Sequence, residues 1–508
     1  MDANEYDVII IGTGAGGGTL AHRLAPSGKK ILVLERGGYL PREKDNWSSK
    51  AVFLEGKYTE KEPWIDDDDQ PFHPGIHYFV GGNTKVYGAA LLRMRQKDFE
   101  ELHHKDGISP KWPISYAEMS PYYTQAEKLY HVHGERGLDP TDSPDDAPYP
   151  YPPLSHDPGI QKLHDQLKSI GHHPFPLPLG LILDESKRES SPCVRCNTCD
   201  GFPCLVNGKA DAQVVCIDPT LKQYPNVTLI THAFVEKLET SPSGKEISKV
   251  IVKKNGKIEF FKGKVVVVSC GAINSAALLL RSANQQHPNG LANSSDVVGR
   301  FYMCHNNSAL LAISTEASTA PFQKTLAIND FYFGADDWKF PLGHIQMLGK
   351  SDGYMLKSDA PPFAPRIILD GLAKHSLDFW LTTEDLPDPS NRVLLAPGGN
   401  VQLLYKPNNQ ESHHHLIEKL KEMLRKAGYH NFYLSQAIPL GGTAHQNGTI
   451  RFGDDPKTSA LDRNCKAHDL ENLYVVDGSF FVSSSSVNPS LTIIANALRV
   501  GDHLLTKL

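Results

Sequence analysis

The sequence predicts an α/β fold with two parts: a Rossmann-type domain on a parallel sheet and a second domain built on an antiparallel sheet with helices. Two observations predict this division. The chain opens with a strand, a glycine-rich turn, a helix and a second strand, and residues 305–405 hold short strand-like stretches among prolines. Apolar residues make up 40% of the 508 residues, which supports large buried cores and excludes wholesale disorder.

The charge balance and the apolar segments exclude several classes of partner. The formal net charge of −6 predicts no general attraction to nucleic acid or to anionic lipid. The most apolar stretch, residues 265–280, is interrupted by Ser269, Asn274 and Ser275 and is too short and too broken to span a membrane. The acidic, polar N-terminus lacks the basic start of a signal peptide. We therefore expect a cytoplasmic protein with no nucleic-acid partner and no membrane span.

The first element carries a nucleotide-binding pattern. Residues 6–11 form a β-branched run without alternation, as expected for a strand buried on both faces of a parallel sheet. Gly12, Gly14 and Gly17 then fit the G-x-G-x-x-G pattern, and residues 19–24 predict a helix. Such glycines permit a tight turn, close approach to a pyrophosphate and tight helix–strand packing. The helix N-terminus offers free N–H groups to phosphate.

A second strand completes this unit. Residues 29–34 predict the strand, and Glu35 at its end lies 18 residues after Gly17, where a dinucleotide-binding unit needs a carboxylate for ribose hydroxyls. A glycine turn alone is a weak signal, because such turns also occur for structural reasons. The ordered strand, turn, helix, strand and acid favour dinucleotide binding, and they leave NAD and FAD both open.

The middle of the chain alternates predicted elements with irregular segments. In residues 81–88, glycines bracket small polar residues, a composition that suits backbone laid against a flat ring, and residues 117–130 predict a helix. The segment 135–192 is dense in proline and aspartate and predicts a surface excursion or lid rather than sheet core. Residues 415–425 predict an amphipathic helix, and the histidine run 413–415 at its start predicts solvated surface.

Further strands are predicted in two groups. Residues 226–230 and 265–269 predict strands, and the second runs through a small-residue turn into a predicted helix at 274–282, which repeats the pattern of the first unit. Residues 379–381 and 392–395 predict antiparallel strands of a separate sheet.

The C-terminal segment carries a recognisable set of motifs. His445 opens a glycine-containing segment that runs to residue 453, a short strand ends at Asp477 and Gly478, and Asn488 with the following proline precedes the last predicted helix. In order and spacing these motifs resemble the glucose–methanol–choline (GMC) family of FAD-dependent oxidoreductases. Residues 81–88 resemble the flavin-side loop of that family, and 112–127 resemble another of its stretches.

The resemblance implies FAD held by residues from both ends of the chain. The ADP half would be held by Gly12, Gly14, Gly17 and Glu35. The isoalloxazine would be lined by Gly81, Gly82 and Asn83. Adenine would contact the backbone of Val235, and the ribityl–pyrophosphate would lie by Asp477 and Gly478. Family members with covalent flavin often use a histidine near the flavin-side loop; residues 81–88 contain none, and His73 and His77 lie upstream, so we expect non-covalent FAD.

The resemblance also implies a catalytic pair, His445 and Asn488, facing the flavin. Oxidation of a CH–OH group needs loss of the hydroxyl proton and transfer of a hydride to flavin N5. An imidazole is a suitable base for the proton, worth typically 10²–10⁴-fold, and an amide can donate to the developing oxyanion. The structural alternatives are a histidine that caps a glycine-rich turn and, for Asp477, a turn residue after a strand.

The expected substrate is a small alcohol, more specifically a sugar or polyol, and the electron acceptor could be oxygen, a quinone or a protein carrier. Aromatic and acidic residues of the second domain could stack and hydrogen-bond a sugar: Phe331, Tyr332, Trp338, Phe379, Trp380, Glu384 and Asp385. Two alternatives remain open. One is a GMC-type lyase that uses His445 as acid and base with FAD as a structural scaffold, and the other is a non-catalytic FAD-binding protein.

The domains are expected to interleave along the chain. The predicted divisions are 1–110 (FAD-binding domain, first part), 111–204 (substrate-domain excursion and Cys-rich loop), 205–304 (FAD-binding domain, second part), 305–430 (substrate domain) and 431–508 (FAD-binding and catalytic C-terminal part).

Four cysteines crowd into twelve residues at Cys193, Cys196, Cys199 and Cys204. Their spacing is close to that of a ferredoxin-type run, and an iron–sulfur cluster there would carry electrons to an external acceptor. A structural zinc site also suits four cysteines. Free thiols or a local disulfide are the third interpretation, so no metal ligand is assigned.

Overall fold

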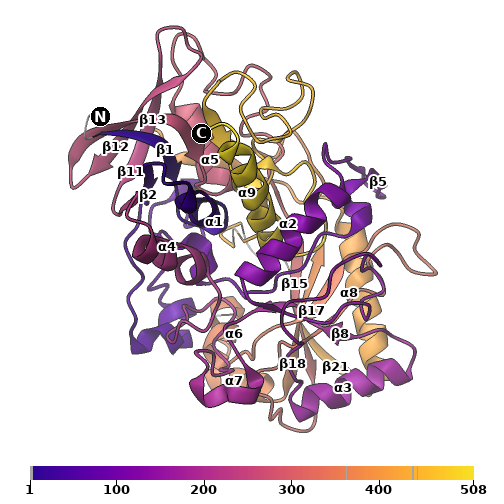
Figure 1. Ribbon diagram of the computed structural model, residues 1–508. Coiled ribbons are helices and arrows are strands. Elements are labelled where there is room, and N and C mark those ends of the chain that lie inside the picture. The colour runs from indigo at the N-terminus through magenta and orange to yellow at the C-terminus, as the bar shows by residue number, and fades with distance from the viewer. Residues whose placement is uncertain (1–3, 362, 437–439, 443) are drawn as a thin grey trace.

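The computed structural model describes residues 4–361, 363–436, 440–442 and 444–508. A seven-stranded sheet in the order β10–β2–β1–β13–β12–β11, with β23 also paired to β13, forms one half of the molecule (Figure 1). Its strands are β1 (Glu5–Ile11), β2 (Ile31–Leu34), β10 (Val227–Ile230), β11 (Phe234–Thr240), β12 (Ile247–Lys254), β13 (Lys257–Val268) and β23 (Leu473–Val475). β10, β2, β1, β13 and β23 run parallel, which confirms the Rossmann-type sheet.

Apolar side chains on both faces of the central strands explain this sheet. Val8, Ile9 and Ile10 are fully buried, as a strand covered on both faces requires. The helices of this half are α1 (Ala15–Leu24), α2 (Tyr116–Leu129), α4 (Asp218–Gln223), α5 (Ala272–Arg281) and α9 (Ser490–Leu505). α1 packs against α9, and α9 packs against α2, so the two ends of the chain meet in one domain (Figure 1).

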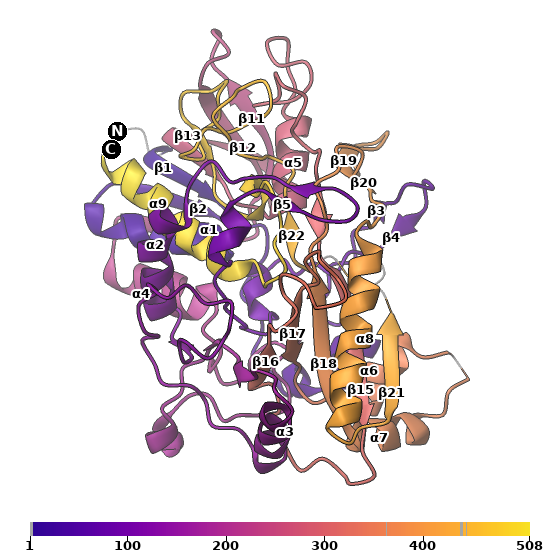
Figure 2. The ribbon, with the colours of Figure 1, turned by 90° about the vertical axis from the view of Figure 1, so that its right-hand side faces the viewer.

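A six-stranded antiparallel sheet, in the order β21–β15–β18–β17–β16–β8, forms the other half. Its strands are β8 (Phe175–Pro176), β15 (Asn306–Ile313), β16 (Leu326–Ile328), β17 (His344–Met347), β18 (Ser376–Thr383) and β21 (Asn431–Gln436). Helix α8 (Gln410–Lys426) packs along β15 and β18 (Figure 2), and α3 (Pro158–Ser169) joins the same core. The predicted antiparallel sheet with helices is confirmed.

Helix α8 docks through one apolar stripe. Leu416, Leu420, Met423 and Leu424 are all buried, and each contributes roughly 1.5–3 kcal/mol on burial. The prediction of a solvated histidine run is wrong for His413. Its ring is buried and hydrogen-bonded to the hydroxyls of the β15 and β18 residues Ser308 and Thr383, because the first turn of α8 already lies on the sheet.

Smaller sheets connect the two halves. One four-stranded sheet consists of β3 (Trp64–Ile65), β4 (Pro71–Phe72), β19 (Arg392–Leu395) and β20 (Val401–Leu404). Three further sheets are pairs of short strands: β5 (Leu102–His103) with β6 (Ile108–Ser109), β7 (Val132–His133) with β9 (Leu179–Gly180), and β14 (Met303–Cys304) with β22 (Gln446–Asn447). Helices α6 (Gly353–Asp359) and α7 (Arg366–Lys374) pack on each other. The segment 135–192 is not only a surface excursion, because it supplies α3 and the edge strand β8.

Both large sheets draw strands from distant parts of the chain. The seven-stranded sheet uses residues 5–34, 227–268 and 473–475, and the six-stranded sheet uses 175–176 and 306–436. The five domain divisions that the sequence suggests remain a prediction. Within the described residues, none of the helices has the length and apolar character that a membrane span needs.

Candidate functional site

A cavity of about 600 Å³ is lined by residues of both halves. One part of the lining comes from the turn after β1, the end of β2, the start of β11, and residues 75–78, 82–84 and 86–90. Another part comes from β17 and β18 of the antiparallel sheet, and residues 444–446, 477–478 and 488–490 complete the lining. Its position beyond the carboxyl ends of parallel strands is where open α/β sheets bind their ligands.

The glycine turn is shaped to admit a large ligand. A Cβ on Gly12 would lie 2.2 Å from the carbonyl oxygen of Ser269, and a Cβ on Gly17 would lie 2.1 Å from that of Gly12. Gly14 is different, since a Cβ there would meet only Gly82, at 4.0 Å. Gly12 and Gly17 therefore serve the turn and the packing of α1, while the open side of Gly14 faces the cavity at the helix N-terminus, where a phosphate gains free N–H groups.

Glu35 ends β2 in a network of buried hydrogen bonds. Its carboxylate accepts the N–H of Thr13 at 3.1 Å and that of Gly37 at 2.9 Å. The Thr13 hydroxyl donates to the same carboxylate and accepts the N–H of Gly81 at 2.9 Å. Burial raises the pKa of Glu35, and these hydrogen bonds oppose the rise. Glu35 thereby joins the β1 turn to the segment 81–88 at the cavity wall.

Most of the predicted cofactor residues line this cavity. Among the described residues, the lining includes Gly12, Gly14, Glu35, Gly82, Asn83, Val235, Asp477 and Gly478. Gly17 and Gly81 lie outside it, because Gly17 is packed behind the turn and Gly81 turns the backbone at φ +97°. Asp477 accepts the N–H of Gly271 at 3.0 Å and that of Ser479 at 2.9 Å, so it also holds the ends of β13 and β23 together.

His445 and Asn488 meet at the cavity wall. Nδ2 of Asn488 lies 3.3 Å from Nε2 of His445, and both side chains line the cavity. Burial, followed by the effects of His305 and His344, places the pKa of His445 well below its ordinary value of 6.5. The ring is therefore neutral at physiological pH. Within the described chain, Oδ1 of Asn488 is buried without a hydrogen-bond partner, an acceptor left for a bound molecule.

His305 is a site residue that sequence reasoning missed. It lies between β14 and β15, and its Nδ1 is 3.0 Å from Nδ1 of His445. A single histidine after a two-residue strand carries no distinctive pattern. Only the pairing of β14 with β22 reveals it, because that pairing joins segments about 140 residues apart.

The antiparallel sheet supplies the remaining wall. Gln346 on β17 and Trp380 on β18 are cross-strand neighbours, and both line the cavity together with Leu348 and Met355. Of the aromatic and acidic residues predicted to contact a sugar, Trp380 is the one in this lining. Phe379 is fully buried in the core on the other face, as the alternation of side chains along β18 requires.

Comparison with known proteins defines the family. Two family models described as GMC oxidoreductase match residues 177–306 and 388–497. The 6'''-hydroxyparomomycin C oxidase of Streptomyces lividus is 30% identical, with 99% of this chain and 92% of that protein covered. The chain belongs to the GMC oxidoreductase family. Paromamine 6'-oxidase of Streptomyces fradiae is also 30% identical (98% and 91% covered), and the fructose dehydrogenase large subunit of Gluconobacter japonicus is 25% identical (99% and 98% covered).

Solved structures agree with this GMC fold. Pyridoxine 4-oxidase from Mesorbium loti matches with a TM-score of 0.67 at 16% identity, covering 98% of this chain and 99% of that one. Formate oxidase of Aspergillus oryzae, solved in a study of its FAD modification, matches with a TM-score of 0.68 at 14% identity, covering 100% and 99%. This GMC oxidoreductase is therefore an enzyme of the oxidase and dehydrogenase type, and FAD is the cofactor that the family implies.

The residues present fit FAD. The open face of Gly14, the helix N-terminus beside it and the buried carboxylate of Glu35 are the features that a dinucleotide needs, and all three adjoin one cavity. Gly82 approaches Gly14 so closely that a Cβ on it would lie 3.0 Å from the Gly14 Cα, so a side chain here would crowd the turn.

The Cys-rich loop of this GMC oxidoreductase gives no support to an iron–sulfur cluster. All eight cysteines of the chain are free thiols, and no group of three or more His, Cys, Asp or Glu side chains in the described ranges could hold a metal ion. Burial raises the pKa of Cys193 to about 12 in the metal-free chain. The same loop places Asp200 and Gly201 in the cavity wall.

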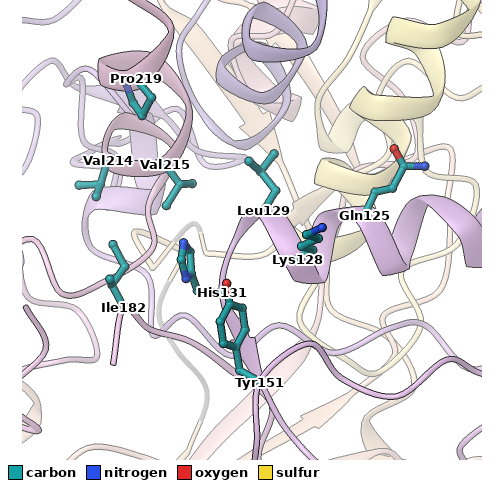
Figure 3. A pocket seen from close by; sticks show the side chains of 9 residues that line it. All are labelled: Gln125, Lys128, Leu129, His131, Tyr151, Ile182, Val214, Val215 and Pro219. Carbon is teal, nitrogen blue, oxygen red and sulfur yellow. The ribbon is translucent and has the colours of Figure 1, made fainter. Parts of the chain in front are cut away.

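A second, more open pocket of about 490 Å³ lies beside the end of α2 (Figure 3). It is lined by Gln125, Lys128, Leu129, His131, Tyr151, Ile182, Val214, Val215 and Pro219, none of which lines the first cavity. The ring of His131 stacks on Tyr151 with centroids 5.1 Å apart. Because none of the predicted site residues lies here, this pocket is separate from the candidate active site.

Proposed function

We propose that this GMC oxidoreductase oxidises a CH–OH group of a sugar, amino sugar or polyol, with FAD bound non-covalently. The observation that carries the proposal is the pair of His445 and Asn488, whose Nε2 and Nδ2 lie 3.3 Å apart in the wall of the cavity that fits the cofactor. The lowered pKa of His445 agrees with a role as a base. Named relatives that oxidise paromamine, hydroxyparomomycin C and fructose support the substrate class.

The cofactor would be held from both ends of the chain. The turn at Gly12 and Gly14, with Glu35, would hold the ADP half, and Gly82 with Asn83 would lie against the ring system. FAD, when bound, supplies the ring that accepts a hydride from the substrate carbon. The protein contributes binding, orientation and control of the proton.

His445 and Asn488 would have different roles at the substrate hydroxyl. Nε2 of His445 accepts the hydroxyl proton: the O–H bond breaks, an N–H bond forms and the oxygen gains alkoxide character, which eases loss of the hydride. A positioned base of this kind contributes typically 10²–10⁴-fold. The amide N–H of Asn488 donates to the same oxygen as its charge develops, a contribution of the order of 10²-fold.

Trp380 and Gln346 support a polar, ring-shaped substrate. An indole face offers an apolar surface for the C–H side of a sugar, and the neighbouring amide supplies hydrogen-bonding atoms. Both lie on the sheet wall of the cavity that His445 also lines. This is a combination that an alcohol with a purely apolar body would not need.

Anaerobic mixing of the holoenzyme with a panel of alcohols tests the proposal. The panel contains hexoses, pentitols, amino sugars, choline and aryl alcohols. The visible absorbance of the flavin is followed during the reaction. We expect bleaching by sugars, amino sugars or polyols. Bleaching by none of the panel would contradict the proposal, and product formation with a flavin that stays oxidised would establish the lyase alternative instead.

A further inference from the structure

The ring of His305 lies directly behind His445. The antiparallel pairing of β14 with β22 sets Met303 opposite Asn447 and Cys304 opposite Gln446. His305 directly follows β14 and His445 directly precedes β22. The two rings meet edge to face, with centroids 5.0 Å apart and planes at 77°. The paired strands β14 and β22 therefore bring the two histidines next to each other, although both lie just outside the strands.

Hydrogen-bond partners place every proton in this pair. Nε2 of His305 lies 3.1 Å from the carbonyl oxygen of Ser484, and because a carbonyl only accepts, this nitrogen carries a hydrogen. Nδ1 of a neutral His305 is then an acceptor, so Nδ1 of His445 carries the shared hydrogen across the 3.0 Å contact. Nε2 of His445 is left with a lone pair, which faces the Asn488 amide.

We propose that His305 is a positioning residue that fixes His445 in the tautomer with its basic lone pair at Nε2, toward the substrate. The inference rests on the proposed function. When Nε2 takes the substrate proton, Nδ1–H of His445 becomes a cationic donor, and the bond to His305 strengthens. Without this acceptor, His445 is free to carry its hydrogen on Nε2, where it cannot act as the base.

The acceptor beside His445 is an uncharged imidazole and not a carboxylate. His344 on β17 lowers the pKa of His445 further. The Glu384 carboxylate raises the pKa of His305 and is not among the groups that shift the pKa of His445. The Glu384 carboxylate is itself 3.2 Å from Nε2 of His104. In the described part of the chain, the group that contacts Nδ1 of His445 is thus an imidazole and not a carboxylate.

Two substitutions separate this role from packing. His305→Phe keeps a ring but removes both nitrogens, and we expect kcat to fall about 10²-fold with KM changed less than about threefold, because His445 loses the acceptor that fixes its tautomer while the binding site is kept. His305→Asn restores a carbonyl acceptor near Nδ1 and should recover kcat to within about tenfold of the parent. An unchanged kcat in His305→Phe, or equal losses in both variants, would overturn the inference.

A spectroscopic measurement on the unmodified holoenzyme avoids any dependence on variant folding. Selective ¹⁵N labelling of histidine distinguishes protonated from unprotonated ring nitrogens, and the His445→Asn spectrum assigns the signals of His445. We expect the hydrogen on Nδ1 and a pyridine-like Nε2, and a hydrogen on Nε2 would overturn the assignment. If the spectrum is as expected but His445→Asn keeps full activity, the proposed function fails while the tautomer stands.

Discussion

His445 shows how single residues set the chemistry of this site. Its ring is partly buried in the cavity wall with His305 behind it, and burial, His305 and His344 all lower its pKa. Burial disfavours the imidazolium because the cation would lose its hydration. A histidine whose pKa is lowered in this way stays neutral at pH values well below 6.5. It can therefore accept a proton across the physiological pH range.

This environment predicts an unusual pH dependence. Protonated His445 cannot accept the substrate proton, and its pKa lies well below 6.5, so kcat/KM should stay level as the pH falls through 6.5 and decline only at more acid pH. Steady-state kinetics from pH 8 to pH 4.5, with flavin retention checked at each pH, measures this. An acid-side inflection at or above about 6.5 would contradict it.

At the scale of elements, the first β–turn–α unit depends on one glycine. The Gly12 backbone has φ +104°, and a Cβ there would lie 2.2 Å from backbone of the Ser269 segment. Gly12→Ala should therefore abolish FAD binding or prevent folding of the unit. Gly28 is a matched control with φ +72° and no atom within 4 Å of an added Cβ.

Flavin content measured by absorbance after purification checks this prediction. Gly28→Ala should retain FAD at a cost of roughly 1 kcal/mol of backbone strain. If Gly12→Ala bound FAD as well as Gly28→Ala, the steric account of the turn would be wrong.

Helix α8 carries a second element-scale prediction, on acid stability. Burial lowers the pKa of His413 to about 3, against about 6.5 in an unfolded chain. Between these values the unfolded state binds more protons, so stability is complete above about pH 6.5 and falls on acidification, by up to about 2 kcal/mol at pH 5. His413→Gln should show a shallower loss of unfolding free energy between pH 7 and pH 5.

The exposed neighbour His414 provides the control, because His414→Gln should keep the full pH dependence of the parent. Urea titrations at the two pH values give the comparison. Identical slopes for His413→Gln and the parent would show that this histidine does not contribute.

The sequence predicted elements best where one periodicity dominates. The buried run of β1 and the apolar stripe of α8 follow directly from their patterns, and both are present. Prediction from the sequence failed where an element depends on a partner that is distant along the chain. The strand β8 lies in a proline-rich stretch and exists because β16 accepts it at the sheet edge, and His413 is buried because α8 begins on the sheet.

At the scale of the whole molecule, one cavity is lined by residues that lie hundreds of positions apart in the sequence. The turn at Gly14, Val235 and His445 line it together. The sequence named Trp380 as one of seven candidates and did not name Gln346, since the face of a strand toward the cavity is set by how the two halves pack. His305 required the β14–β22 register.

The same architecture predicts that FAD is released on unfolding. We expect acid precipitation to leave all flavin in the supernatant, because the residues proposed to hold FAD would act through hydrogen bonds and packing. Added FAD should also raise the unfolding free energy of the stripped protein, by about 2.7 kcal/mol at one hundred times its dissociation constant. A yellow pellet would show a covalent link, and His77, which lines the cavity, would be the first side chain to substitute.

The central claim is that Nε2 of His445 accepts the substrate proton, and the rate constant of anaerobic flavin reduction tests it most directly. His445 has φ +56°, which asparagine tolerates, and His131 in the second pocket has φ +51°, so His131→Asn is a matched control for His445→Asn. We expect His445→Asn to retain FAD and to lower this rate constant by about 10²–10⁴-fold, with the control unchanged. An FAD-loaded His445→Asn enzyme that is reduced as fast as the parent would contradict the account.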